Sequence, residues 1–546
     1  MTRSSGHFSL RRITRAVFVT GALCAGTLAA FTVSAETLRW ASTGDFLTFD
    51  IHAQNETLNS AANAAVYEGL VRLDEKMAIE PALATSWERV PEGFLFTIRE
   101  SVRFHEGETL TPDDVVFSIN RALLPGSQFR STAAGILGAE KTADGKVLIR
   151  TTTGTPVILR QLASLRVLCR SWAEAHGALE PQNFIGGEES YAAKHANGTG
   201  PFKLVSRTPD VRTEFEAFDG WWDQANRKGN VTRVVYTPIA SAATRTAALL
   251  SGEVDFVLDP AVQDVARLSK DPNVKILSGS EDRVMMIALD CGREVSPYVT
   301  GKDGKPLAAN PLRDPRVREA LSLAVNREGL VRDVMRGHGT ATGTVVSHAV
   351  DGWNEDVARV TPADPAKAKA LLAEAGYPSG FRITIDTPNN RWVNDEAMVK
   401  AVASMWGRIG VETAVRAMPR AQYFPKVLSF DISAALVGWS SSTFDAYRPL
   451  QSLSATFNPK TGDGISNVGR VSSPAMDAAL RKLAVEENAE ARTKLAREAL
   501  AIERAEFLHV PLLEQHLSWA MRKGVTAVLR PDNVLVMERV TVEPAK

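Results

Sequence analysis

The sequence is poor in cysteine and histidine, which limits the chemistry that it can carry. Its 546 residues include three cysteines and nine histidines. His105 is followed by Glu-Gly-Glu without the second histidine of a zinc-protease motif, and the serines at 440–442 lack the glycines of a hydrolase motif. His509 and His516 have no short-spaced histidine or cysteine partner for zinc. The sequence therefore gives no support for catalysis, for a metal held by side chains or for a bound cofactor.

Long apolar runs are also scarce, and the one that stands out lies at the start of the chain. Residues 16–33 are mostly apolar, follow four arginines and end in Val33-Ser34-Ala35. Acids are absent before Glu36, and glycines and threonines interrupt the run, so a secretory signal peptide over residues 1–35 is favoured over a membrane anchor. Leu23 precedes Cys24 where a lipoprotein needs a small residue, so we expect no lipid at that cysteine.

The chain has no excess of charge of one sign. The full sequence has 63 basic and 63 acidic residues, and removal of the signal peptide deletes four arginines, which leaves a formal charge of −4. This balance disfavours nucleic-acid binding. The mature part keeps Cys169 and Cys291, which are either paired in an oxidising compartment or two free, buried thiols.

The segment 94–118 carries the densest set of structural signals. Phe94, Phe96 and Ile98 alternate with other residues as in a strand with one buried face. Thr111 then stands before Pro112 as an N-cap stands before the first helical residue, and two aspartates follow near the positive end of the helix dipole. The segment predicts a strand, a turn and a capped helix.

This segment resembles the signature of the family 5 extracellular solute-binding proteins, the dipeptide-, oligopeptide- and nickel-binding receptors of bacterial ABC importers. Further segments are similar to that family, namely Glu80–Trp87, Gly198–Lys203, Phe218–Trp222 and Thr244–Phe256. The resemblance covers essentially the whole mature chain, although it becomes thin between about 125 and 197.

Strand and helix patterns alternate after residue 244, which favours an α/β fold. The resemblance implies a two-lobed periplasmic binding protein-like fold with a hinge of two crossing segments, near 283–291 and 507–516, and an extra subdomain in the first lobe at about 60–195. It places the first lobe at 36–287 and 510–546, and the second at 288–509. Two lobes also suit a chain that exceeds a single core of about 250–300 residues.

The same resemblance implies a function in uptake. A monomeric receptor in the periplasm captures a peptide or peptide-like solute between its lobes and delivers it to an ABC permease in the inner membrane. An oligosaccharide, opine or metal-chelate receptor of the same family is the first alternative. A secreted hydrolase with an unrecognised site is the alternative from another class.

Candidate ligand contacts gather in the segment 436–449. Peptide receptors of this family have an aspartate three residues after a tryptophan, and it pairs with the peptide ammonium. Here Trp439 matches the tryptophan and Asp445 a following acid, but Ser442 takes the place of the ammonium-binding aspartate. Arg448 either binds an anionic ligand group or pairs with Asp445 and fixes the loop.

Two other loops supply weaker candidates. Arg391 and Trp392 follow a predicted strand, and ligands in open α/β sheets lie beyond the carboxyl ends of strands. Their alternatives are a solvent-facing arginine and a tryptophan seated on the next helix. Asp45 and His52 lie in a loop near the start of the mature chain, where His52 could equally shape the loop through a hydrogen bond.

Overall fold

The computed structural model describes residues 35–130, 132–152, 157–184, 188–441 and 443–544. The predicted signal peptide lies outside the described residues except for Ala35. Contacts join the chain from Ala35 onward into one unit. Within the described part, every helix is too short or too polar to cross a membrane.

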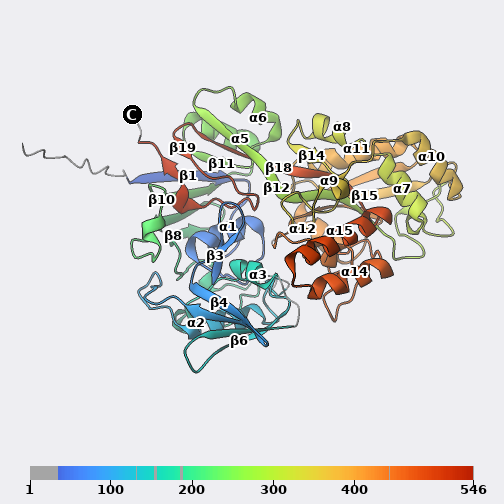
Figure 1. Cartoon of the computed structure of the whole chain (residues 1–546). Helices are drawn as coiled ribbons and strands as arrows, with labels where there is room; N and C mark the ends of the chain where they lie inside the picture. Colours follow the sequence, from blue (N-terminus) through green and yellow to red (C-terminus); the bar gives the residue numbers. More distant parts are fainter. Residues whose placement is uncertain (1–34, 131, 153–156, 185–187, 442, 545–546) are drawn as a thin grey trace, which may run out of the picture. The chain divides into compact units, whose positions relative to one another are not determined.

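A mixed α/β fold is built on one twelve-stranded sheet (Figure 1). Its main path runs in the order β13 (Val299–Thr300), β15 (Arg382–Pro388), β17 (Ala434–Trp439), β12 (Val274–Leu289), β18 (His509–Arg522), β11 (Phe256–Leu258), β1 (Glu36–Ser42), β10 (Val231–Pro238), β9 (Arg212–Ala217) and β8 (Phe202–Thr208). Two further strands pair with β18 and β15, respectively: β14 (Gly339–Ala341) and β16 (Glu412–Met418).

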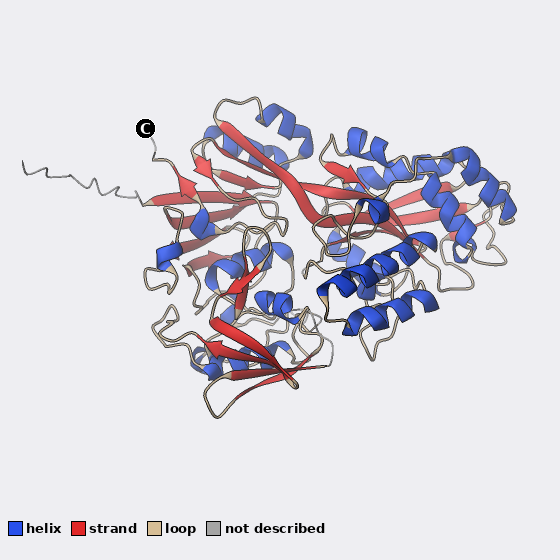
Figure 2. Ribbon diagram, viewed as in Figure 1, coloured by secondary structure: helices blue, strands red, loops and turns tan. Residues whose placement is uncertain are grey.

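The strands β12 and β18 are much longer than the others and connect the two lobes (Figure 2). They pair antiparallel over both halves of their length, with an irregularity between Ser280 and Val284. On one side of this bulge the strands contribute Trp519 and Met521 to the first lobe's core, and on the other side Met285 and the following residues enter the second lobe's core. Both crossing segments expected from the resemblance are therefore strands of the same ladder.

The first lobe packs the sheet from β8 to β11 against helices and a second layer of strands. Its core contains Trp40, Phe96 and Trp519, all almost fully buried. Its helices are α1 (Thr57–Val66), α2 (Pro112–Ala122), α3 (Ile158–Ser164), α4 (Arg170–Ala175), α5 (Ala242–Ser251) and α6 (Val262–Leu268). Because β10 and β11 both run parallel to β1, α5 is the crossover helix expected from the segment Thr244–Phe256.

Smaller sheets complete the first lobe. A four-stranded sheet has the order β4 (Ala84–Val90), β5 (Gly93–Ile98), β7 (Val147–Thr151) and β6 (Ile136–Lys141). Two short ladders are β2 (Val71–Leu73) with β3 (Ile79–Pro81), and β19 (Val525–Thr526) with β20 (Thr541–Val542). Single turns of 3-10 or π helix occur over the whole chain at η1 (Tyr191–Ala193), η2 (Gln224–Asn226), η3 (Pro311–Arg313), η4 (Leu330–Val334) and η5 (Met537–Arg539).

The strand and capped helix predicted around residue 100 are confirmed. The strand is β5, and α2 starts at Pro112 with Thr111 as its N-cap. The Asp114 carboxylate accepts hydrogen bonds from the Thr111 N–H at 2.8 Å and from its hydroxyl at 2.6 Å. The first helix, α1, runs from Thr57 to Val66, and the Glu56 side chain caps it by accepting from the Asn59 N–H.

The second lobe packs helices against β15, β16 and β17. These helices are α7 (Pro315–Leu323), α8 (Arg327–Gly329), α9 (Glu355–Ala358), α10 (Pro365–Glu374), α11 (Asp395–Arg408), α12 (Arg420–Leu428), α13 (Tyr447–Leu453), α14 (Pro474–Val485) and α15 (Ala489–Ala505). Trp406 of α11 is fully buried, and its indole N–H donates to the Leu321 carbonyl at 3.0 Å. The alternation of strand and helix predicted for this part of the chain is confirmed.

Cys169 and Cys291 are both free thiols in the described structure. Cys169 belongs to the first lobe's core, whereas Cys291 packs against the cores of the second lobe. Of the two arrangements left open by the sequence, the structure has the unpaired one.

One glycine of β17 determines how Trp392 packs. A Cβ atom at Gly438 would lie 2.7 Å from the Trp392 indole and 2.8 Å from the Met285 sulfur. We therefore expect Gly438→Ala to lower the free energy of unfolding by about 1–3 kcal/mol, the usual cost of overpacking a core. Denaturant unfolding followed by tryptophan fluorescence measures this change.

Gly407→Ala is the matched control, because a Cβ atom there meets nothing within 4 Å. Gly407 lies inside α11, where alanine is better than glycine by about 0.5–1 kcal/mol. Equal unfolding free energies for the two variants would contradict the packing described for Trp392.

Candidate ligand-binding site

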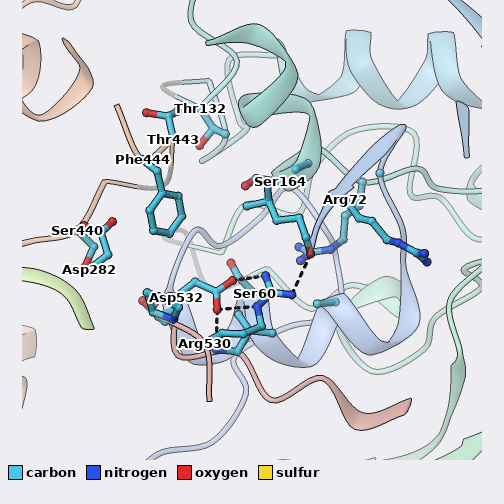
Figure 3. Close-up of a pocket in the computed structure, with 18 of the residues that line it drawn as sticks. Ser60, Arg72, Thr132, Ser164, Asp282, Ser440, Thr443, Phe444, Arg530 and Asp532 are labelled. Carbon is cyan, nitrogen blue, oxygen red and sulfur yellow. Dashed lines mark hydrogen bonds and ion pairs between the residues drawn. The ribbon is translucent and has the colours of Figure 1, made fainter. Parts of the chain in front are cut away.

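A cavity of about 560 Å³ is lined by segments of both lobes and by the bulge of β12. Its volume is within the range of about 300–1,000 Å³ that is usual for small-molecule sites. The first lobe contributes Arg72 and Ser164, and the second contributes Ser440 and Phe444 (Figure 3). In this view the Phe444 ring points from the second lobe toward the first-lobe residues Ser164 and Arg72.

The bulge places three consecutive charged residues, Glu281, Asp282 and Arg283, at the cavity wall. Glu281 accepts hydrogen bonds from Arg283 Nε at 2.9 Å and from Gln515 Nε2 at 2.6 Å. Regular pairing would send these side chains to alternating faces of the sheet. The irregular ladder is therefore what brings this charged segment to the site.

The end of β17 and the loop after it supply the second lobe's wall. Trp439 and Ser440 line the cavity, and the buried indole N–H of Trp439 and the hydroxyl of Ser440 have no hydrogen-bond partner in the described structure. Arg448 also lines the cavity and donates to Gln451 Oε1 at 2.7 Å. Burial lowers the pKa of the Arg448 guanidinium. The structure thus brings together Trp439 and Arg448, two residues expected at the site.

Asp445 requires a correction. It is not among the described residues that line the cavity, and its carboxylate receives two bonds from Arg492, at 2.7 Å to Oδ2 and 2.9 Å to Oδ1. Both side chains of this pair are about nine-tenths buried. The acid therefore anchors the loop onto α15 through Arg492, not through Arg448. Ser442, the other candidate of this loop, lies outside the described residues.

Arg391 and Trp392 are neighbours in sequence but have different surroundings. Arg391 lines the cavity, where burial and then the charge of Arg283 lower its pKa. Trp392 instead covers Gly438 and contacts Tyr423 and Phe424 edge-on. Trp392 thus packs as a structural tryptophan would, but these contacts join it to β17 and α12 and not to the next helix, α11.

Asp45 and His52 lie in the interior of the first lobe. Asp45 accepts hydrogen bonds from Arg207 at 3.2 Å and from the Asp210 N–H at 2.8 Å. His52 is buried behind the cavity-lining Phe129, and its Nδ1 lies 3.1 Å from an Arg121 nitrogen. Burial, and then the Arg121 charge, lowers the pKa of His52 to about 3, so the ring is neutral. His52 thus has the loop-shaping role that was considered for it.

The charged lining residues are mostly arginines. The described wall contains seven arginines and five acids. Among the described residues, no carboxylate forms an ion pair with Arg166 or Arg391, and burial lowers the pKa of Arg166 to about 10. Burial also raises the pKa of Glu68 to about 7, which weakens one of the acids. The cavity therefore has an excess of positive charge and favours an anionic group.

Sequence reasoning missed Arg166, Glu68 and Asp282. Arg166 falls in the part of the chain where the family resemblance is thin, and the acids belong to segments that read as ordinary helix ends or strands. No short motif marks any of them. Within the described residues, no group of three or more His, Cys, Asp or Glu side chains is placed to hold a metal ion.

Comparison with known proteins tests the family resemblance. Residues 78–460 match the model of the family described as "Bacterial extracellular solute-binding proteins, family 5 Middle". This match confirms the resemblance drawn from the motifs. Heme-binding protein A of Haemophilus influenzae is 28% identical over 479 residues, which are 82% of this chain and 81% of that protein. Glutathione-binding protein GsiB of Salmonella typhimurium is 27% identical over 527 residues, 93% and 95% of the two chains.

Solved structures share the fold. AgaA of A. tumefaciens R10 in complex with agropinic acid has a TM-score of 0.77 at 23% identity, covering 94% of this chain and 99% of its own. DppA of Helicobacter pylori in complex with the peptide STSA has a TM-score of 0.77 at 21% identity, covering 93% and 98%. These likenesses confirm the expected two-lobed α/β fold.

The Asp445–Arg492 pair predicts a stability effect. Removing one partner of a buried ion pair leaves an uncompensated charge, so we expect Asp445→Ala to lower the free energy of unfolding by about 3–5 kcal/mol. Urea unfolding of the protein without ligand measures it. Asp333→Ala breaks the exposed pair with Arg332 and should change stability by less than about 1 kcal/mol. If Asp445→Ala left the stability unchanged but abolished ligand binding, Asp445 would be a ligand contact and not a structural anchor.

Proposed function

Because the chain belongs to the bacterial extracellular solute-binding proteins of family 5, we propose that it is the substrate-binding component of an ABC importer and captures a small, peptide-like solute with at least one anionic group. It acts in the periplasm as a monomer after removal of residues 1–35. It passes the solute unaltered to a permease in the inner membrane.

The observation that carries this proposal is the unequal charge of the cavity wall. Arg166 from the first lobe and Arg391 from the second both line the cavity, and neither forms an ion pair with a described acid. A buried guanidinium without a counterion is costly, and a carboxylate offers it two parallel hydrogen bonds. A ligand carboxylate that meets these groups would remove that cost.

The relatives support a peptide-like solute. GsiB is named for glutathione, a γ-linked tripeptide with two carboxylates, and AgaA was solved with agropinic acid. A cavity of about 560 Å³ has room for molecules of this size. These names describe the relatives, and for this chain they define which ligands are tested first.

Capture follows from the way the lobes are joined. We place the first lobe at 36–287 and 510–546 and the second at 288–509, with β12 and β18 as the hinge. Ligand shifts such a protein toward a closed form only through contacts that it gains on closure. Arg166 and Arg391 come from different lobes, so an anion that touches both gains contacts only when the lobes approach.

Thermal denaturation with a ligand panel tests the proposal. Glutathione, agropinic acid, haemin and a neutral dipeptide, N-acetylated and C-amidated so that it carries no charged group, are each added to the purified mature protein. Binding to the native state alone raises the melting temperature. We expect stabilisation by glutathione or agropinic acid and none by the neutral dipeptide. Stabilisation by haemin or the neutral dipeptide alone, or chemical conversion of a bound ligand, would contradict the proposed function.

A single substitution tests the arginine contact. Arg391→Ala should weaken binding of the stabilising anion about tenfold or more, because a hydrogen bond to a charged group contributes about 1.5–3 kcal/mol. It should leave the melting temperature of the ligand-free protein unchanged or raised, since no described ion pair is lost. Titration calorimetry measures the affinity. Arg408→Ala, at an exposed position near the end of α11, is the matched control.

A further inference from the structure

Asp282, on the bulge of β12, is a buried acid of the cavity wall that forms no ion pair with any described residue. Its residue surface is only 3% exposed, yet it lines the cavity. Its backbone N–H donates to the Pro531 carbonyl of the first lobe at 2.9 Å. Figure 3 shows its side chain beside Ser440 of the second lobe. Asp282 thus lies where the crossing strand meets segments of both lobes.

The donors to the Asp282 carboxylate are neutral. The Ser347 hydroxyl donates to Oδ1 at 2.7 Å, and the backbone N–H of Ser441 also donates to this carboxylate. The adjacent Arg283 directs its guanidinium to Glu281 instead, at 2.9 Å. Among the described residues, no ion pair includes Asp282. A carboxylate removed from water in this way is costly unless a cation joins it. Accordingly, burial raises the pKa of Asp282 to about 7.

The other lining acids have more donors or more neighbouring arginines inside the protein than Asp282 has. Glu68 accepts bonds from the indole N–H of Trp222 at 2.8 Å and of Trp221 at 3.2 Å, and from the Thr199 hydroxyl at 2.9 Å. Glu281 is held by Arg283 and Gln515, and Asp532 by Arg530. Glu538 lies in the field of three arginines, Arg539, Arg227 and Arg72. Asp282 differs from these acids because its one side-chain donor is the Ser347 hydroxyl and because it lies beside Ser440, whose hydroxyl has no hydrogen-bond partner in the described structure.

We propose that Asp282 binds the primary ammonium group of the solute, while the cavity arginines bind its carboxylate. This inference rests on the proposed function and narrows it: the ligand is a zwitterion with a free amine. The ammonium has three N–H donors, and a bond to the carboxylate together with one to the unpartnered Ser440 hydroxyl would use two of them. The donors to Asp282 are neutral, so its negative charge is not already balanced by an arginine. The carboxylate therefore remains available to pair with the ammonium.

The test compares free-amine and N-acetylated probes by titration calorimetry. The probes are glutathione, alanyl-glutamate and the N-acetyl form of each. We expect the protein to bind at least one free-amine probe about tenfold or more tightly than its acetylated form, because acetylation removes the charge and two of the donors. Asp282→Asn keeps the size of the side chain and its hydrogen bonds to neutral donors, and should reduce this ratio to about one.

Glu538→Gln is the matched control, since it neutralises another lining acid. The ratio between free and acetylated probes should remain as in the unsubstituted protein. A ratio near one in the unsubstituted protein, or a ratio that survives in Asp282→Asn, would overturn the assignment of Asp282. The ratio compares the affinities of two probes for the same variant. A substitution that weakens the binding of both probes equally therefore leaves the ratio unchanged.

A proton measurement on the unsubstituted protein gives a second readout that does not depend on the variant folding. The groups that face Asp282 are Glu281 and Arg283 on its own strand and His348 on the loop beyond Ser347. With a pKa of about 7, roughly half of the Asp282 carboxyls carry a proton at pH 7. An ammonium favours the ionised form, so near neutral pH the binding of the free amine should release more protons than binding of the acetylated probe. Equal release for both probes would overturn the inference.

The outcomes separate this inference from the proposed function. If agropinic acid, which serves as the anionic ligand without a peptide ammonium, stabilises the protein but neither free-amine peptide does, the proposed function stands and the role of Asp282 falls. If no anionic ligand binds, both fall. If the free-amine peptides bind and the acetylated ones do not, both stand.

Discussion

The antiparallel pairing of β12 with β18 is the constraint on which the rest of the structure depends. These strands belong to the cores of both lobes, and β17, which pairs with β12, leads directly into the cavity segment that begins at Trp439. The irregularity of their ladder falls at 281–283, where the strands pass between the lobes. A regular ladder there would be stiffer and would lack the three charged side chains at the wall. The same local irregularity therefore serves the hinge and the binding site.

Two groups of buried charges among the described residues bear on the binding site. In the first group both partners are protein side chains: Asp50 with Arg121, and Asp445 with Arg492, each bonded through both carboxylate oxygens. These pairs fix loops on helices far away in the sequence. In the second group Arg166, Arg391 and Asp282 face the cavity without a described counterion. Uncompensated burial lowers stability, so a fold keeps it only where a ligand or a function offsets the cost.

Local patterns predicted the fold better than the site. The caps Thr111, Asp314 and Asp364 and the glycine after α5 define helix ends through neighbours within a few residues, and Thr111 is found at the helix start where the sequence placed it. Arg492, which holds Asp445, lies 47 residues further along the chain, and nothing near Asp445 indicates it. Gly438 likewise accepts Trp392 only after two distant segments have packed together. Trp439, Arg391 and Arg448 were predicted at the cavity because they follow strands or match a motif, whereas Arg166 and Asp282 have neither mark.

The arrangement of unpaired charges also restricts what can close the cavity. A ligand with only an anionic group pairs with the arginines but leaves the buried Asp282 without a cation. A ligand with only an amine pairs with Asp282 but leaves the arginines without an anion. Only a solute that carries both charges at suitable separation relieves both costs at once, and the arginines that it meets come from opposite lobes. Closure then depends on the two ends of one molecule instead of on its net charge. A zwitterion with no net charge can therefore be favoured over a more highly charged competitor. The reason is that selectivity depends on the positions of the unpaired charges in the cavity and not on the net charge of the ligand.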